Sequence, residues 1–190
     1  MKKVLIIGAS GSLAQYVIEA SKNLENIELT LFLRNKTRIS TELSDGCKII
    51  EGDALNFNDI KNAVANQDIV YVNLEGNLEL MSKNIVKAMQ EEGVKRIIAI
   101  SSIGIYDQPL KPVLVPYRKL ADVIENSGLD YTILRPDWFT NADEIDYSVT
   151  IKGLPETGSA ISRKSIADFI SKLFIYPNLY VNENLGISKP

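Results

Sequence analysis

The fold is decided by the stretch Val4-Leu5-Ile6-Ile7-Gly8-Ala9-Ser10-Gly11-Ser12-Leu13-Ala14. Its apolar start predicts a buried strand, and the glycine turn that follows leads at once into an amphipathic segment typical of a helix. A strand, turn and helix in this order bring backbone N–H groups up to a pyrophosphate, with Gly8 permitting the tight turn and Gly11 the close approach. A purely structural turn is the alternative, because glycines end many strands. We predict a dinucleotide site formed by Gly8, Ala9, Ser10, Gly11, Ser12 and Leu13.

Size and composition predict one ordinary globular domain. The chain has 190 residues, of which 45% are hydrophobic and 24% charged, so we expect a single domain over residues 1–190. The apolar runs are of strand length, which predicts no membrane span and a cytoplasmic protein. The net charge of −3 provides no general attraction for nucleic acid. We expect a small-molecule substrate and a monomer or homodimer.

Two scarce residue types narrow the chemistry. The absence of histidine excludes Ser-His-Asp triads and imidazole metal sites. The single cysteine, Cys47, excludes an internal disulfide and a thiolate zinc site, and its apolar neighbours predict a buried core thiol. We therefore predict no metal centre.

Strand-length and helix-length segments alternate along the chain. Strands are predicted at 3–7, 28–33, 47–51, 69–73, 96–100 and 131–134, and helices at 12–24, from 58, at 80–92 and at 117–126. This alternation is typical of an α/β, Rossmann-type doubly wound parallel sheet of order 3-2-1-4-5-6. Residues 137–190 are expected to form a small substrate-side region with a strand at 147–151, a helix at 162–174 and an extended piece at 179–181. Ligands of such a sheet bind at the carboxyl ends of its strands.

Cations follow the second predicted strand. Arg34, Lys36 and Arg38 stand where an NAD-selective enzyme usually carries a carboxylate for the ribose hydroxyls. An arginine fork can instead hold the 2′-phosphate of NADP. A solvated charged loop is the alternative. Arg34 and Arg38 therefore favour NADP(H), with NAD(H) possible.

Polar residues follow the third and fourth strands as well. Gly52 and Asp53 come after the third strand, where Asp53 could accept a hydrogen bond from the adenine amino group or cap the following turn. Asn73 ends the fourth strand and would pass beside the cofactor. Glu75 would face a pyrophosphate unfavourably, so we expect it to point to solvent.

The fifth strand ends in Ser101 and Ser102, where a nicotinamide ring and a substrate carbonyl would meet. Serine hydroxyls at strand ends also bond the turning backbone, which is the alternative. We include Pro136, at the end of the sixth strand, among the cofactor-binding candidates.

On these residues the chain resembles the atypical short-chain dehydrogenase/reductases, and among them the small NmrA-like, NAD(P)H-binding group. The likeness is carried by Gly8-Ala9-Ser10-Gly11, Gly52-Asp53 and Ser101-Ser102. Its most specific segment is Ser127-Gly128-Leu129-Asp130-Tyr131-Thr132-Ile133-Leu134-Arg135-Pro136, and Ser162-Arg163-Lys164-Ser165-Ile166-Ala167-Asp168 resembles the start of the group's C-terminal helix. The resemblance covers essentially the whole chain. It implies a Rossmann fold, bound NADP(H) or NAD(H), and often a poorly defined reductase activity.

The chain departs from the wider superfamily at its acid–base pair. Catalytic members carry Tyr-x-x-x-Lys on the helix after the fifth strand, where the lysine lowers the tyrosine pKa. Here Tyr117 stands at the usual lysine position and Val113 at the usual tyrosine position. Tyr106 or Tyr117 could approach a substrate instead, or solvent could supply the proton to a quinone or flavin acceptor. Packing is the alternative role for both tyrosines.

The substrate region is short. Trp138 and Phe139, directly after Pro136, are candidates for a pocket wall above the nicotinamide, or they could cover the sheet edge. The sequence thus favours an NADP(H)-dependent oxidoreductase acting on a small carbonyl or quinone-like acceptor without the usual Tyr-x-x-x-Lys pair. The alternative is a non-catalytic NAD(P)H-binding redox sensor or regulatory protein.

Overall fold

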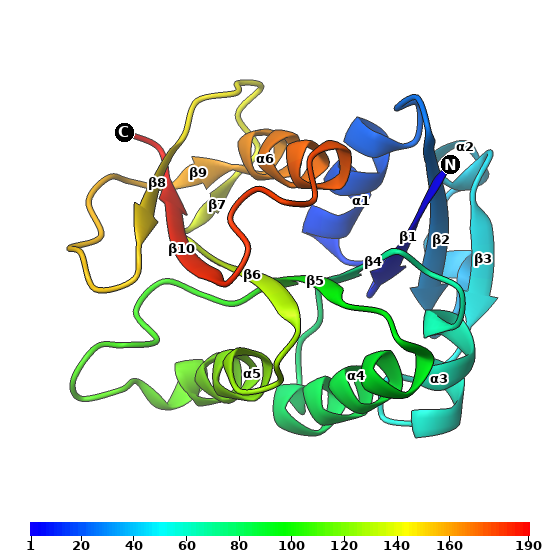
Figure 1. Ribbon diagram of the computed structural model, residues 1–190. Coiled ribbons are helices and arrows are strands. Elements are labelled where there is room, and N and C mark those ends of the chain that lie inside the picture. Colours follow the sequence, from blue (N-terminus) through cyan, green and yellow to red (C-terminus); the bar gives the residue numbers. More distant parts are fainter.

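A computed structural model describes residues 1–190, and its centre is an eight-stranded sheet (Figure 1). Six parallel strands stand in the order β3-β2-β1-β4-β5-β6, which confirms the predicted order 3-2-1-4-5-6. Their bounds are β1 Lys2–Ile7, β2 Ile27–Leu33, β3 Lys48–Glu51, β4 Ile69–Val72, β5 Arg96–Ile100 and β6 Asp130–Pro136. Beyond β6 the sheet continues with β10 (Glu183–Ser188), parallel to β6, and with β8 (Ser148–Ile151), antiparallel to β10.

Helices cover both faces of the sheet. The α1 (Ser12–Ser21) and α6 (Arg163–Ile175) helices lie on one face, and α3 (Phe57–Val64), α4 (Leu78–Glu92) and α5 (Val115–Glu125) on the other (Figure 1). Successive residues of β1 belong to the two separate hydrophobic cores, because side chains alternate between the faces of a strand. Val4 to Ile7 are consequently 0% exposed, as expected for a strand buried on both sides.

Asparagine caps start two of these helices earlier than the apolar pattern predicts. The Asn56 side chain accepts hydrogen bonds from the N–H groups of Asn58 and Asp59, so α3 begins at Phe57. Asn77 does the same for Leu80, so α4 begins at Leu78. Short elements not predicted from the sequence are α2 (Thr41–Ser44) and the 3-10 turns η1 (Lys36–Arg38) and η2 (Pro112–Leu114). Cys47 lies just before β3, partly buried against the core, and burial raises the pKa of its thiol.

The C-terminal region differs from the prediction at its last strand and contains a small sheet that was not predicted. The extended piece expected at 179–181 is wrong, because Tyr180 and Asn182 have φ angles of 53° and 61° and form a turn. The strand follows them as β10, which fills the place between β6 and β8. A second, two-stranded sheet pairs β7 (Phe139–Thr140) with β9 (Ile161–Ser162), and it holds Phe139 close to the start of α6. No helix combines the length and the apolar character needed to cross a bilayer.

Candidate cofactor and substrate site

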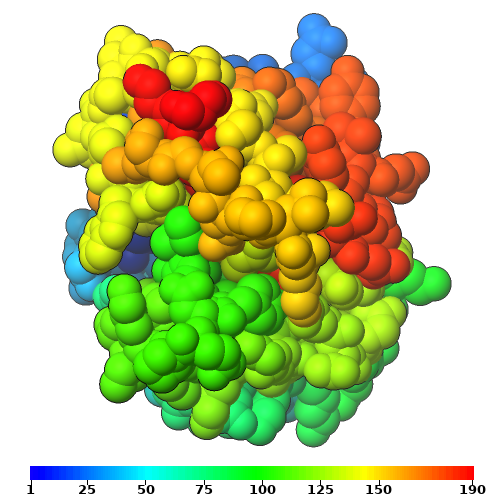
Figure 2. Space-filling view, turned by 90° about the vertical axis from the view of Figure 1, so that its left-hand side faces the viewer, coloured from blue at the N-terminus to red at the C-terminus, as the bar shows by residue number.

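A cavity of about 1150 Å³ lies at the carboxyl ends of the parallel strands. It extends across the point where the strand order reverses between β1 and β4, the usual ligand position in a doubly wound sheet. Figure 2 looks onto the side where green residues after β5 meet yellow residues after β6, with dark-blue atoms of the N-terminal segment in a hollow between them. Predicted site residues that line the cavity are Gly8, Ser10, Gly11, Ser12, Leu13, Arg34, Arg38, Gly52, Asp53, Asn73, Ser101, Ser102, Tyr117, Pro136, Trp138 and Phe139.

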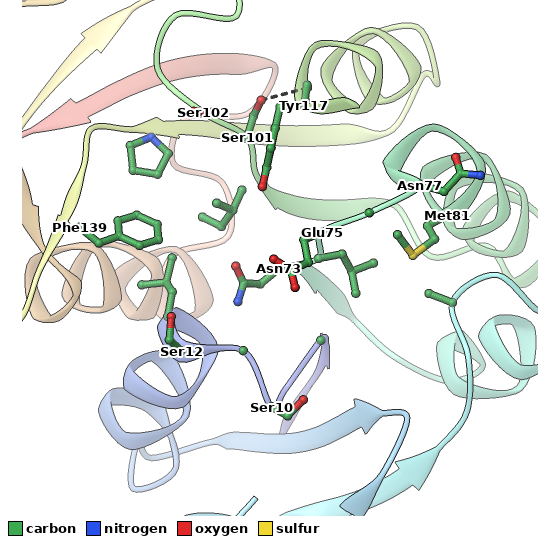
Figure 3. A pocket seen from close by; sticks show the side chains of 18 of the residues that line it. Ser10, Ser12, Asn73, Glu75, Asn77, Met81, Ser101, Ser102, Tyr117 and Phe139 are labelled. Carbon is green, nitrogen blue, oxygen red and sulfur yellow. Dashed lines mark hydrogen bonds between the residues drawn. The ribbon is translucent and has the colours of Figure 1, made fainter. Parts of the chain in front are cut away.

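The glycine turn is held tightly against the end of β4. Gly8 has a φ of +87°, and a Cβ at this position would lie 2.1 Å from the Asn73 carbonyl oxygen. A Cβ on Gly11 would lie 2.8 Å from Asn73 Nδ2. Gly8 therefore needs glycine, because both its φ and a backbone atom exclude a side chain, whereas a residue at Gly11 would displace the Asn73 side chain. Asn73 is the residue against which the turn packs (Figure 3).

The first turn of α1 is open to an anion. Its N-cap, Gly11, offers no side-chain hydrogen bond, and no acidic residue stands in the first turn. The N–H groups of Ser10, Ser12 and Leu13 have no acceptor within the protein. Free N–H groups and the positive end of a helix dipole are what a diphosphate requires, so this turn fits the diphosphate of a dinucleotide. Ala9 itself does not line the cavity, because it is fully buried and its N–H donates to the Phe32 carbonyl.

Two arginines line the end of the cavity beyond β2. Arg34 and Arg38 are both exposed, and neither forms an ion pair within the chain. Lys36, between them, is different: its ammonium lies 3.6 Å from a Glu51 carboxylate oxygen, and it does not line the cavity. Two guanidinium groups are thus available to an anionic ligand, whereas the third cation is used within the protein.

The segment after β3 packs on Phe32 and makes its own turn. A Cβ on Gly52 would lie 2.7 Å from the Phe32 ring, so a larger residue would displace this segment. One carboxylate oxygen of Asp53 accepts from the Leu55 N–H at 2.9 Å, which is the turn-capping role. The second carboxylate oxygen has no hydrogen-bond partner within the chain. Because Asp53 lines the cavity, this oxygen is available to a ligand.

Glu75 is exposed, as expected, but its side chain also lines the cavity (Figure 3). It acts on Tyr117, which lines the same space from α5. Burial, and then the charge of Glu75, raise the pKa of the Tyr117 phenol. No lysine counteracts this shift, so the phenol of Tyr117 keeps its proton at neutral pH.

The serine hydroxyls after β5 bond to the backbone. Ser101 is buried, and its hydroxyl donates to the Tyr117 carbonyl at 3.0 Å, which ties β5 to α5 (Figure 3). The Ser102 hydroxyl is bonded to the Ile103 carbonyl at 3.2 Å. Of the two, Ser102 is the more accessible to a ligand.

The structure does not bring Tyr106 to the cavity. Its hydroxyl donates to Glu125 at 3.2 Å and accepts from Asn184 Nδ2 at 2.8 Å, so it belongs to a polar network between α5 and β10. The guanidinium groups of Arg118 and Arg135 lie over its ring. Burial raises the pKa of Tyr106, and we leave this residue out of the site.

The remaining wall is apolar and lies at the mouth. Trp138 is 81% exposed and Phe139 38%, and Val113 faces the same space from η2 at 72%. Sequence reasoning missed Lys111 and Leu114, which line the cavity from the segment before α5. Nothing in their local sequence marks them, since only the folding of this segment over β5 brings them there.

No group of three or more acidic or cysteine side chains lies close enough together to hold a metal ion. The polar groups that line the cavity are backbone N–H donors, amides, hydroxyls, arginines and scattered carboxylates. They match a nucleotide rather than a cation.

Comparison with known proteins agrees with this geometry. The sequence profile of a family described as NAD(P)H-binding matches residues 8–177. The chain belongs to this NAD(P)H-binding family. The matched range includes the glycine turn, the arginines after β2 and the whole of α6.

Solved members of this fold superpose closely on the whole chain. A Rossmann-fold NAD(P)-binding family protein from Shigella flexneri is 42% identical, with a TM-score of 0.92 over 100% of this chain and 94% of that one. A short-chain dehydrogenase/reductase from Veillonella parvula, solved in complex with NADP, is 27% identical, with a TM-score of 0.91 over 100% and 95% of the two chains. The family match and the structural superpositions therefore indicate the same Rossmann-type NAD(P)H-binding fold.

A curated relative from Nicotiana tabacum, an isoflavone reductase homolog A622-like protein, is 27% identical over 155 residues, or 73% of this chain. The match covers 49% of the relative, so the chain spans about half the length of that protein.

Proposed function

We propose that this protein is an NADP(H)-dependent oxidoreductase acting on a small carbonyl or quinone-like acceptor. The observation that carries the proposal is the continuous cavity from the free N–H groups of α1 to the aromatic mouth at Trp138 and Phe139. The NADP complex of the Veillonella relative and the reductase names among the plant relatives support it.

The preference for NADP(H) over NAD(H) rests on Arg34 and Arg38. Both have charges that no carboxylate of the chain neutralises, and a 2′-phosphate can accept two charge-assisted hydrogen bonds from a guanidinium. The N–H groups of Ser10, Ser12 and Leu13 would hold the diphosphate. Asp53 would accept from the adenine amino group with the oxygen that its turn leaves free.

When bound, the reduced nicotinamide would supply a hydride to the acceptor. Phe139 and Pro136 would limit access of water to this part of the cavity, with Trp138 at its rim. The protonated phenol of Tyr117 would orient the acceptor oxygen by donating a hydrogen bond. Ser102 would do the same only on releasing the Ile103 carbonyl, to which its hydroxyl donates in this structure. Because Val113 replaces the usual tyrosine and no lysine lowers the pKa of Tyr117, water would supply the proton.

One observation favours a second candidate, a non-catalytic NAD(P)H-binding sensor. Ser101, at the end of β5, uses its hydroxyl on the Tyr117 carbonyl, and no Tyr-x-x-x-Lys pair stands beside it. A protein with these features could bind the cofactor and report its redox state to a partner.

The loss of NADPH absorbance in the presence of a panel of quinones and small aldehydes separates the two candidates. We expect turnover with at least one quinone. Tight NADPH binding with no turnover on any acceptor would contradict the oxidoreductase and favour the sensor. A chain that binds neither nicotinamide nucleotide would contradict both.

A further inference from the structure

Arg163, the first residue of α6, connects the two halves of the cavity wall. Its Nε donates a long hydrogen bond of 3.4 Å to the Ser12 hydroxyl oxygen at the start of α1. Its guanidinium carbon lies 5.0 Å from the centre of the Phe139 ring. Ser12 and Phe139 both line the cavity, and Figure 3 shows them on the same side of it. Arg163 itself does not line the cavity.

The contact with Arg163 determines what the Ser12 hydroxyl can do. Its oxygen accepts from Nε, and it donates to no acceptor in the protein, so its hydrogen is free for an anion in the cavity. The N–H groups of Ser10, Ser12 and Leu13 are free at the same place. An oxygen that accepts from a cation is a stronger donor, because successive hydrogen bonds polarise one another.

The charge of Arg163 has no carboxylate partner. Its other hydrogen bonds go to neutral oxygens, the Asn141 side chain at 2.7 Å and the Thr140 carbonyl at 3.5 Å. The adjacent Lys164, by contrast, is paired with Asp143. A partly buried guanidinium beside a helix N-terminus adds positive potential where a diphosphate would lie.

Arg163 also holds an aromatic wall. Phe139 belongs to β7, whose partner β9 ends at Ser162, directly before Arg163. The planar guanidinium can stack on the ring, which an ammonium cannot do in the same way. Phe139 is thus fixed from both its backbone and its ring face.

We propose that Arg163 is a positioning residue for the cofactor: it orients the Ser12 hydroxyl toward the diphosphate and fixes Phe139 beside the nicotinamide. This inference rests on the proposed function, because it needs a dinucleotide in the cavity. It adds a residue far away in the sequence to the diphosphate subsite.

Calorimetric titration of NADPH, ADP-ribose and 2′-AMP into wild type, Arg163→Gln and Lys164→Gln tests the inference. ADP-ribose carries the diphosphate, whereas 2′-AMP reaches only the end of the cavity at Arg34 and Arg38. We expect Arg163→Gln to weaken NADPH and ADP-ribose by about tenfold, the value of one charge-assisted contact, and to leave 2′-AMP unchanged. Lys164→Gln removes a neighbouring charge that is already paired, so it should change none of the three affinities.

A double-mutant cycle distinguishes positioning from a general structural role. If Arg163 acts in part through Ser12, the effect of Arg163→Gln on ADP-ribose should be clearly smaller in a Ser12→Ala background, where only the direct effect of the charge remains. Equal effects in both backgrounds, or an equal loss of 2′-AMP affinity, would overturn the inference. If wild type and Arg163→Gln bind NADPH equally well, the inference is overturned and the proposed function stays intact. Wild type that binds no NADPH would overturn both.

Discussion

Gly8 and Asn73 are in such close contact that a single added carbon on Gly8 would meet the Asn73 carbonyl oxygen at 2.1 Å. The contact joins the carboxyl ends of β1 and β4, which are paired strands. It keeps the glycine turn flat against the sheet, so the free N–H groups at the start of α1 stand at the cavity surface. The position of the proposed diphosphate subsite therefore depends on the close contact between Gly8 and Asn73.

Replacement of Gly8 by alanine is expected to lower the free energy of unfolding by more than about 2 kcal/mol, because backbone strain and a backbone clash add together. Gly76→Ala is the matched control, since Gly76 also has a positive φ, +99°, but a Cβ there meets nothing within 4 Å. Backbone strain alone should lower the free energy of unfolding of Gly76→Ala by about 1–2 kcal/mol. Urea unfolding measures both, and equal losses would contradict the role of the Asn73 contact.

Arg34→Gln and Arg38→Gln are each expected to weaken NADPH binding by about 10- to 100-fold and to leave NADH binding unchanged. The reason is that only NADPH presents a 2′-phosphate to the two guanidinium groups. Lys36→Gln is the control, because Lys36 belongs to the same loop but pairs with Glu51 outside the cavity. Calorimetry gives the affinities, and a parallel loss of NADH affinity would refute the assignment.

Tyr117 is expected to stay protonated up to a pH above the ordinary tyrosine value of about 10. Burial and the charge of Glu75 both disfavour the phenolate, so they raise the pKa of Tyr117. Ultraviolet difference titration of wild type against Tyr117→Phe measures this ionisation directly. A tyrosinate signal that develops below about pH 9 and is lost in Tyr117→Phe would show an activated phenol and contradict the proposed hydrogen-bonding role.

Tyr106→Phe is expected to lower the free energy of unfolding by about 1–2 kcal/mol, because Glu125 and Asn184 lose a partly buried partner. Cofactor affinity and turnover should not change, since Tyr106 lies outside the cavity. Tyr176→Phe serves as the control for stability, as Tyr176 is 59% exposed. A loss of turnover without a loss of stability would return Tyr106 to the list of catalytic candidates.

Glu79 is expected to make stability depend on pH in acid. Hydrogen bonds from Lys119 and Lys83 lower the pKa of this partly exposed carboxyl to about 2 in the folded protein. A carboxyl with a lowered folded pKa stabilises fully above its unfolded value, about 4.3, and this contribution disappears as the pH falls toward 2. Urea midpoints of wild type and Glu79→Gln should therefore differ at neutral pH and converge near pH 2. Glu25→Gln, an exposed carboxylate without an ion pair, should show no such convergence.

The sequence by itself was sufficient for the parallel sheet, its strand order and the glycine turn. Apolar runs such as Val4–Ile7 bury both faces of a strand, and that burial is a local property of composition. The arginines after β2 could also be placed from the sequence, because a residue that directly follows a strand in this topology lies at the carboxyl edge of the sheet. Helix starts at Asn56 and Asn77 were also within reach, since the cap residue is adjacent to the helix that it starts.

Only the tertiary structure showed that Tyr117 lines the cavity and Tyr106 does not. The position of β10 and the contacts of Arg163 also came from the tertiary structure alone. The two tyrosines are equally aromatic and near the same strand, but Asn184 and Glu125 engage Tyr106 from elements far away in the chain. The strand Glu183–Ser188 carries little apolar periodicity and forms because β6 and β8 supply its hydrogen bonds. Arg163 reaches Ser12 across 151 positions of sequence. Contacts of this kind depend on packing between segments that are distant in the sequence, so a local pattern of residues cannot predict them.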